Sequence, residues 1–123
     1  MKIKKKVQEA ANVLGFQNPR RFQINPINSI LDHQDTLVIA PTSAGKSPIF
    51  QIPAIIGAKR GEWTLVIEPI IALMADQCRK LQDHGIAAEL LTSHNKNEHE
   101  SIYTKLQAGD ITILYVTAER LQM

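Results

Sequence analysis

The residues with the clearest chemical signature lie at positions 40–47, in the order Ala-Pro-Thr-Ser-Ala-Gly-Lys-Ser. Apart from Ala40 in place of the first glycine, they fit the P-loop pattern G-x-x-x-x-G-K-[ST]. In such a loop, successive backbone N–H groups surround a phosphate, and the glycine before the lysine lets the chain approach the anion closely. The residues predicted to form this cradle are Thr42, Ser43, Ala44 and Gly45.

Lys46 and Ser47 complete the predicted chemistry of this loop. The Lys46 ammonium group would neutralise charge on the β- and γ-phosphates, which makes it the predicted catalytic residue. The Ser47 hydroxyl is the predicted ligand of the Mg²⁺ that accompanies a triphosphate. The alternative is a chance glycine-rich loop with a surface lysine, which would need strand, loop and helix to fall in the right order by accident.

The segments around this loop alternate as a parallel sheet requires. Residues 36–40 predict a fully buried strand before the loop, because they are short, continuous, apolar and partly β-branched. Strands alternating with helices indicate parallel βαβ units in a doubly wound α/β sheet, whose ligands bind beyond the carboxyl ends of the strands. Further helices are predicted at 47–56, 70–84 and 97–106, and further strands at 63–67, 88–91 and 111–116.

Two more helices are predicted before the first strand. Asn25 and Pro26 suit the N-cap and first position of the second helix. Gly15 stands where the first helix should end. The apolar stripe of the first helix is Val7, Ala10, Ala11 and Leu14, and that of the second is Ile27, Ile30 and Leu31.

Composition limits the remaining possibilities. The chain has 123 residues and 44% hydrophobic content, enough for one core and too little for two ordinary domains. Cys78 is the only cysteine, and the four histidines have no acidic partners at metal-ligand spacing, so we predict no disulfide and no protein-bound metal centre. No apolar run approaches the ~18 residues that span a membrane. We therefore expect a soluble intracellular protein with no membrane partner.

The residues that flank the loop resemble those of RecQ helicases. Residues 46–54 are similar to the continuation of the loop in that family, and Phe16, Arg20 and Gln23 match the spacing of its nucleotide-base motif. The resemblance implies that the ligand is ATP, with Phe16 stacked on adenine and with Arg20 and Gln23 at its polar edge. The alternative for Phe16 is packing beneath the first helix.

Two later segments extend the resemblance to a path for DNA. Residues 69–77 are similar to motif Ia of RecQ helicases, and residues 117–121 to motif Ib. The resemblance implies that these loops bind the phosphates of one DNA strand without reading bases. Glu68 departs from the family, and its carboxylate would repel a phosphate. The residues predicted to line the DNA are Pro69, Gln77, Thr117 and Arg120, although Gln77 is better suited to orienting a loop and Arg120 is equally suited to a surface ion pair.

The resemblance also implies the domain type. Residues 1–123 are expected to form a single partial RecA-like P-loop NTPase domain, with a parallel sheet flanked by helices and with residues 1–32 as N-terminal helices that carry the base motif. No acidic motif of the Asp-Glu-x-His kind follows Thr117. We therefore expect an incomplete fold, truncated before that motif, which binds nucleotide and does not hydrolyse it alone. The family implies DNA repair and recombination in the cytoplasm, nucleus or nucleoid, together with a second RecA-like domain.

Three other interpretations remain open. The Thr-Ser-Ala-Gly-Lys order also occurs in Ski2-like helicases, which leaves the branch of superfamily 2 open. A small P-loop kinase or ATPase would need an aspartate at a strand end, whereas the apolar run 111–116 ends in Thr117. A non-catalytic interaction module descended from a helicase would fit the missing acidic motif and Glu68.

Overall fold

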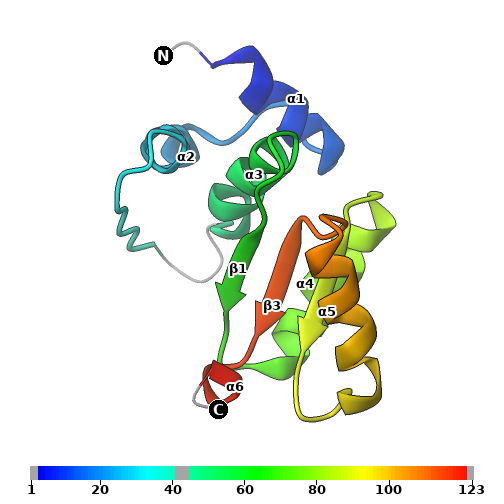
Figure 1. Ribbon diagram of the computed structural model, residues 1–123. Helices are drawn as coiled ribbons and strands as arrows, with labels where there is room; N and C mark the ends of the chain where they lie inside the picture. Colours follow the sequence, from blue (N-terminus) through cyan, green and yellow to red (C-terminus); the bar gives the residue numbers. More distant parts are fainter. Residues whose placement is uncertain (1–2, 41–44, 122–123) are drawn as a thin grey trace. The chain divides into compact units, whose positions relative to one another are not determined.

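The protein is described by a computed structural model that covers residues 3–40 and 45–121. Its chain divides into two compact units, Met1–Ile56 and Gly57–Met123. The first unit is helical, and the second contains a sheet between helices (Figure 1). The prediction that residues 1–123 form one domain stays a prediction.

The first unit contains α1 (Lys5–Val13), α2 (Arg21–Leu31) and most of α3 (Ser47–Ala58). The predicted stripe of the first helix is confirmed, because all four of its apolar side chains are buried. Gly15 follows α1 with a φ of 91° and donates its backbone N–H to the carbonyl oxygen of Asn12 at 3.0 Å. That left-handed conformation is cheap for glycine and ends the helix where the sequence predicts.

The second helix begins earlier than its sequence predicts. Arg20 is the N-cap, so Pro26 lies inside α2, and the predicted start at Asn25 and Pro26 is wrong. The Gln23 side chain accepts a hydrogen bond from the backbone N–H of Arg20 at 2.7 Å, which closes the first turn. Pro26 lacks only one intrahelical donor, and the helix tolerates that loss. The buried face is as predicted for Ile27 and Leu31.

The strand predicted at residues 36–40 is not present in the structure. Leu37 is 86% exposed and Ile39 is 90% exposed, and no strand is assigned to this segment. A strand forms only where a neighbouring strand satisfies its backbone groups, and the sheet in the described part of the chain pairs other segments. The apolar, β-branched sequence gives this segment strand propensity but not a partner.

The second unit is built on three parallel strands in the order β1-β3-β2, which confirms the α/β prediction (Figure 1). In the register of β1 and β3, Ile67 lies beside Val116. The strands are β1 (Thr64–Ile67), β2 (Ala88–Leu91) and β3 (Ile113–Val116), and the helices are α4 (Ile71–Asp83), the short 3-10 helix η2 (Lys96–Glu98), α5 (His99–Gln107) and α6 (Ala118–Leu121).

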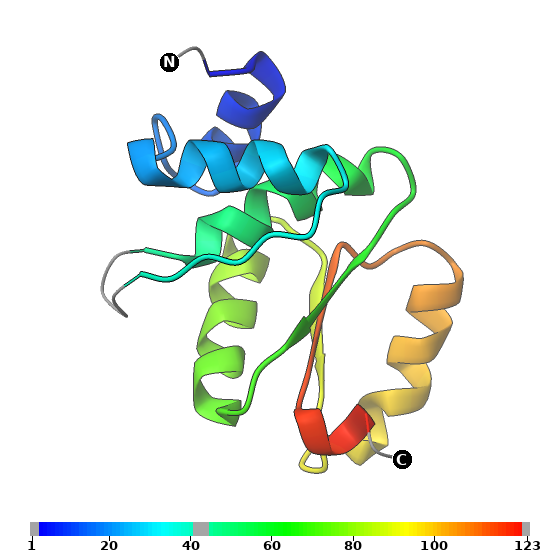
Figure 2. The same ribbon diagram turned by 90° about the vertical axis from the view of Figure 1, so that its left-hand side faces the viewer.

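The core of this unit surrounds β3, all four of whose residues are buried. Helices α4 and α5 cover opposite faces of the sheet (Figures 1 and 2). On one face, Ile102 of α5 packs in a cluster with Leu114 and Val116. On the other, the Tyr115 hydroxyl donates a 3.0 Å hydrogen bond to Oε1 of Gln77 in α4. Burial on both faces explains why this central strand is continuously apolar.

Candidate nucleotide site

Gly45 belongs to the predicted phosphate loop and contacts the predicted base motif. The other predicted residues of this cradle, Thr42, Ser43 and Ala44, lie outside the described residues. The φ of Gly45 is +81°, a conformation that favours glycine. A Cβ atom added there would lie 3.3 Å from Nη1 of Arg20. Backbone conformation therefore favours glycine at this position, and a side chain here would also be in tight contact with the end of the Arg20 side chain.

Gln23 links the start of α2 to this loop. Its amide nitrogen donates to the carbonyl oxygen of Gly45 at 2.7 Å, and its Oε1 accepts from the backbone N–H of Arg20 at 2.7 Å. Only 3% of Gln23 is exposed, and both bonds are part-buried. The structure thus places two residues of the predicted base motif, Arg20 and Gln23, against the predicted phosphate loop. Sequence reasoning missed the bond itself, because residue types 22 positions apart carry no signal for it.

Phe16 lies in the turn between α1 and α2 and is 46% exposed. Its backbone N–H donates to the carbonyl oxygen of Ala11 at 2.9 Å, which fixes the chain beside the end of α1. The side chain is half-exposed, so Phe16 is not a fully buried core residue. An exposed aromatic face is what stacking on a base requires, although that role stays a prediction.

Lys46 and Ser47 stand at the start of α3, as the P-loop pattern requires. Ser47 is the first residue of the helix, and Lys46 precedes it with an exposed side chain. The N–H groups of a first helical turn lack intrahelical partners and favour anions. One of these positions is occupied by Pro48, which is buried and has no N–H.

The predicted DNA-binding residues are only partly brought together. β1 and β3 end side by side, with the Glu68 N–H donating to the carbonyl oxygen of Val116 at 3.1 Å. This pairing places Pro69, which is exposed, and Thr117, which is buried, together at the carboxyl ends of β1 and β3. Gln77 instead lies within α4, bonded to a core tyrosine. The Arg120 side chain lies outside the described residues.

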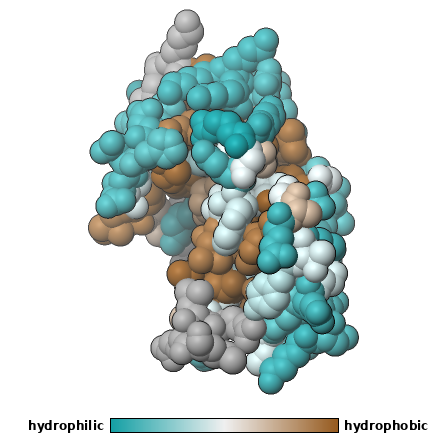
Figure 3. Space-filling view, in the orientation of Figure 1, coloured by the Kyte–Doolittle hydropathy of each residue, from teal (hydrophilic) through white to brown (hydrophobic). Residues whose placement is uncertain are grey.

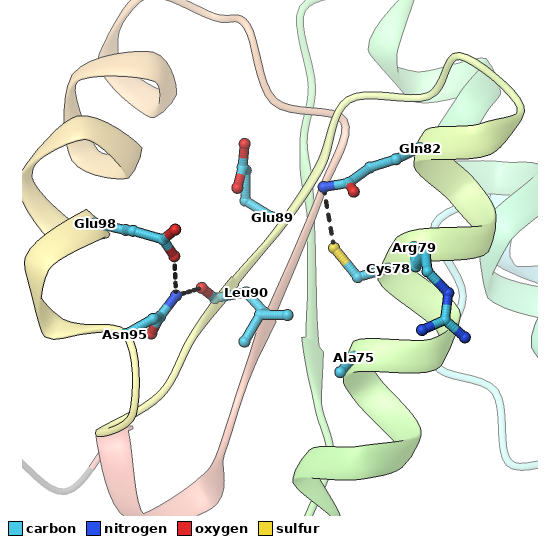
Figure 4. Close-up of a pocket in the computed structure, with 8 residues that line it drawn as sticks. All are labelled: Ala75, Cys78, Arg79, Gln82, Glu89, Leu90, Asn95 and Glu98. Atoms are coloured by element: carbon cyan, nitrogen blue, oxygen red, sulfur yellow. Dashed lines mark hydrogen bonds between the residues drawn. The ribbon is translucent and has the colours of Figure 1, made fainter.

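A cavity of about 190 Å³ lies between α4, β2 and η2 (Figure 4). Cys78 faces it, and burial, with a smaller contribution from the Glu89 carboxylate, raises the pKa of this thiol to about 11. The thiol is therefore protonated at neutral pH and suited to neither nucleophilic attack nor metal binding. Within the described residues no three His, Cys, Asp or Glu side chains are grouped to hold a metal ion.

Comparison with known proteins identifies relatives over most of the sequence. A family model described as DEAD/DEAH box helicase matches residues 20–123. The chain is 40% identical over 111 residues to "ATP-dependent DNA helicase RecQ" of Haemophilus influenzae, covering 89% of this chain and 17% of that protein. It is 41% identical over 113 residues to "ATP-dependent DNA helicase Q-like 2" of Arabidopsis thaliana, covering 89% and 16%.

These matches cover most of this chain and a small part of each relative. A second bacterial protein, "ATP-dependent DNA helicase RecQ" of Pasteurella multocida, is 39% identical over 110 residues, covering 89% of this chain and 17% of its own length. The chain therefore spans less than a fifth of the curated relatives that it matches. Among its described residues, no helix is both long enough and apolar enough to cross a membrane.

Proposed function

The chain belongs to the DEAD/DEAH box helicase family, and from this premise we propose that it is the ATP-binding part of a RecQ-like DNA helicase. The observation that carries the proposal is the hydrogen bond from Gln23 to Gly45, which joins the base motif to the phosphate loop. The proposed adenine site consists of Phe16, Arg20 and Gln23. These relatives are named as ATP-dependent DNA helicases, which agrees with this ligand.

Mg²⁺ fits the residues at the start of α3. The Ser47 hydroxyl is a hard oxygen donor, and Mg²⁺ is commonly held by one or two protein oxygens together with phosphate oxygens and water. The ion would neutralise phosphate charge when bound. Lys46 is proposed to hold the β- and γ-phosphates by a direct ionic contact, and α3 to add its N-terminal N–H groups.

We further propose that the 123-residue chain binds nucleotide without hydrolysing it. Phosphoryl transfer requires a carboxylate that positions Mg²⁺ or water, and no acidic pair follows β3 within this sequence. In the complete motor, such carboxylates and an arginine from a second RecA-like domain would supply these functions. DNA unwinding is accordingly proposed for that larger assembly.

Calorimetric titration with Mg-ADP tests the nucleotide site. We expect Lys46→Ala to weaken binding about tenfold, because it removes one charge-assisted contact from an exposed side chain. Lys59→Ala, which changes another exposed lysine, should leave the affinity unchanged. No phosphate release from ATP is expected. Absence of Mg-ADP binding by the folded wild-type chain would reject the ATP site and favour an interaction module.

We propose that DNA binds at the carboxyl ends of β1 and β3, where Glu68, Pro69 and Thr117 lie. We expect weak binding of single-stranded DNA, because few phosphates are contacted, and an affinity that falls further as the salt concentration rises. Glu68→Ser should tighten binding several-fold by removing a negative charge near the phosphates. Fluorescence anisotropy over a salt series measures both effects, with Glu100→Ser on α5 as a control for net charge. If the affinity changes neither with salt nor with Glu68→Ser, DNA does not bind at these strand ends.

A further inference from the structure

Tyr115 places a polar hydroxyl inside an apolar part of the sheet. The residue is fully buried in β3, whose other members are Ile113, Leu114 and Val116. In Figure 3, hydrophobic atoms gather over the middle of the molecule, where Figure 1 places β1 and β3. Moving a hydroxyl from water into such surroundings costs free energy unless it finds a hydrogen-bond partner. Phenylalanine would fill the same space without this cost, so what distinguishes tyrosine here is the bond that its hydroxyl makes.

That bond joins β3 to α4. The Tyr115 hydroxyl donates to Oε1 of Gln77 at 3.0 Å. α4 makes its main strand contacts with β2, and its buried residues are the apolar Met74, Cys78 and Leu81. Apolar contacts are non-directional, whereas a hydrogen bond fixes the distance and the angle between two groups. The bond from Tyr115 to Gln77 therefore limits rotation and sliding of α4 against β3.

Both ends of this link lead to the proposed DNA site. α4 begins at Ile71, just after the loop that contains Pro69, and β3 ends at Val116, just before Thr117. Figures 1 and 2 both show the start of α4 and the start of α6 at the same end of the sheet. At that end the Glu68 N–H donates to the Val116 carbonyl oxygen at 3.1 Å. The two loops are thus connected by a backbone bond at the strand ends and, through α4, by a side-chain bond.

We propose that Tyr115 is a positioning residue for DNA binding. Its hydroxyl acts through Gln77 on the start of α4. This bond holds the loop at Pro69 at a fixed separation from Thr117. The inference rests on the proposed binding of DNA at these strand ends. Phosphates of one strand are covalently linked, so two loops contact two of them together only if the separation of the loops matches. Tyr115 is fully buried and acts on DNA only through the position of these loops.

Tyr115→Phe tests the proposal, because it removes the hydroxyl and keeps the ring in the core. We expect the affinity for single-stranded DNA at low salt to fall about tenfold, which corresponds to the loss of one charge-assisted contact. For single strands, log K falls with log salt by about 0.7 for each phosphate contacted, so this slope should decrease by roughly 0.7. A purely structural role would leave the slope of the folded protein unchanged. Fluorescence anisotropy over a salt series, well below the melting temperature of both proteins, measures affinity and slope.

Two further variants control this experiment. Tyr103→Phe makes the same chemical change on α5, where the residue is 40% exposed, and should change neither the affinity nor the slope. Gln77→Leu removes the acceptor, and combining it with Tyr115→Phe should weaken binding no further than the weaker single variant, since both remove one interaction. If Gln77→Leu weakens binding and Tyr115→Phe does not, Gln77 contacts DNA directly and the positioning role of Tyr115 is wrong.

Hydrogen exchange without DNA separates this inference from the proposed DNA function. The Glu68 amide donates to β3, and the Met74 amide donates to the Ile70 carbonyl oxygen at 3.2 Å in the first turn of α4, so both report on the link. In Tyr115→Phe we expect both amides to exchange about threefold faster relative to the amides of α5. Faster exchange with no DNA binding by the wild-type chain would support the link and reject DNA as its purpose. Unchanged exchange at both amides, or a wild-type affinity and slope in Tyr115→Phe, would overturn the positioning role.

Discussion

Replacing Gln23 with alanine is expected to lower the free energy of unfolding by roughly 2 to 4 kcal/mol and to remove the preference for ADP over GDP. The buried amide satisfies the N–H of Arg20 and the carbonyl oxygen of Gly45, each at 2.7 Å. Without it, both backbone groups lose their partner, and because both are only partly buried each loss costs about 1 to 2 kcal/mol. Urea denaturation measures the first effect, and calorimetry with the two nucleotides measures the second.

Gln23→Glu separates the two roles of this side chain. A glutamate still accepts a hydrogen bond from the Arg20 N–H, whereas it faces the Gly45 carbonyl oxygen with a second acceptor. We therefore expect α2 to keep its start while the link to the phosphate loop is broken. Gln8→Ala, which removes an exposed side-chain hydrogen bond in α1, should change stability by less than about 0.5 kcal/mol.

Base selectivity provides the result that would contradict this account. If wild-type protein binds ADP and GDP equally, Gln23 and Arg20 do not read the base, and the amide of Gln23 serves only to cap α2 and hold Gly45. A loss of selectivity in both variants, with the larger loss of stability in Gln23→Ala, would support both roles. Stability and selectivity are separate measurements, so one role can fail without the other.

Elements with a local signal were predicted well. β2 occupies the predicted range, because a helix-ending glycine at position 85 precedes it and a polar stretch follows it. The start of α2 was not predicted, because it depends on a side-chain hydrogen bond from Gln23 that residue type does not reveal. The segment 36–40 shows a different limit, since strand formation depends on a neighbour that sequence propensity does not supply.

In the candidate site, too, local sequence patterns were predictive and contacts between distant residues were not. Spacing assigned Arg20 and Gln23 to one motif and Gly45 to another, and the structure shows the contact between them. The role of Gln77 at DNA stays a prediction, and in the structure its side chain accepts a hydrogen bond from Tyr115. Residues 69–77 include both a loop and the first turns of α4, whose side chains partly face the core. Sequence similarity over the segment does not show which individual residues face the core.

Pro48 offers the sharpest test of the phosphate loop. It directly follows Ser47 in the first turn of α3, where P-loop proteins commonly donate a backbone N–H to the α-phosphate. The fold tolerates proline there because first-turn donors lack intrahelical partners, and the next N–H, that of Ile49, already bonds to the Lys46 carbonyl oxygen at 3.0 Å. The missing donor therefore affects the ligand more than the helix.

Pro48→Leu is accordingly expected to tighten Mg-ADP binding about ten- to a hundredfold, because a hydrogen bond to a charged group contributes roughly 1.5 to 3 kcal/mol. The melting temperature without ligand should change little. Pro53→Leu is the matched control, since Pro53 lies in the interior of α3, where a restored N–H stabilises the helix and does not reach the ligand. Calorimetric titration of both variants decides the matter. Equal or weaker binding by Pro48→Leu would mean that a water or a shifted loop already serves the α-phosphate.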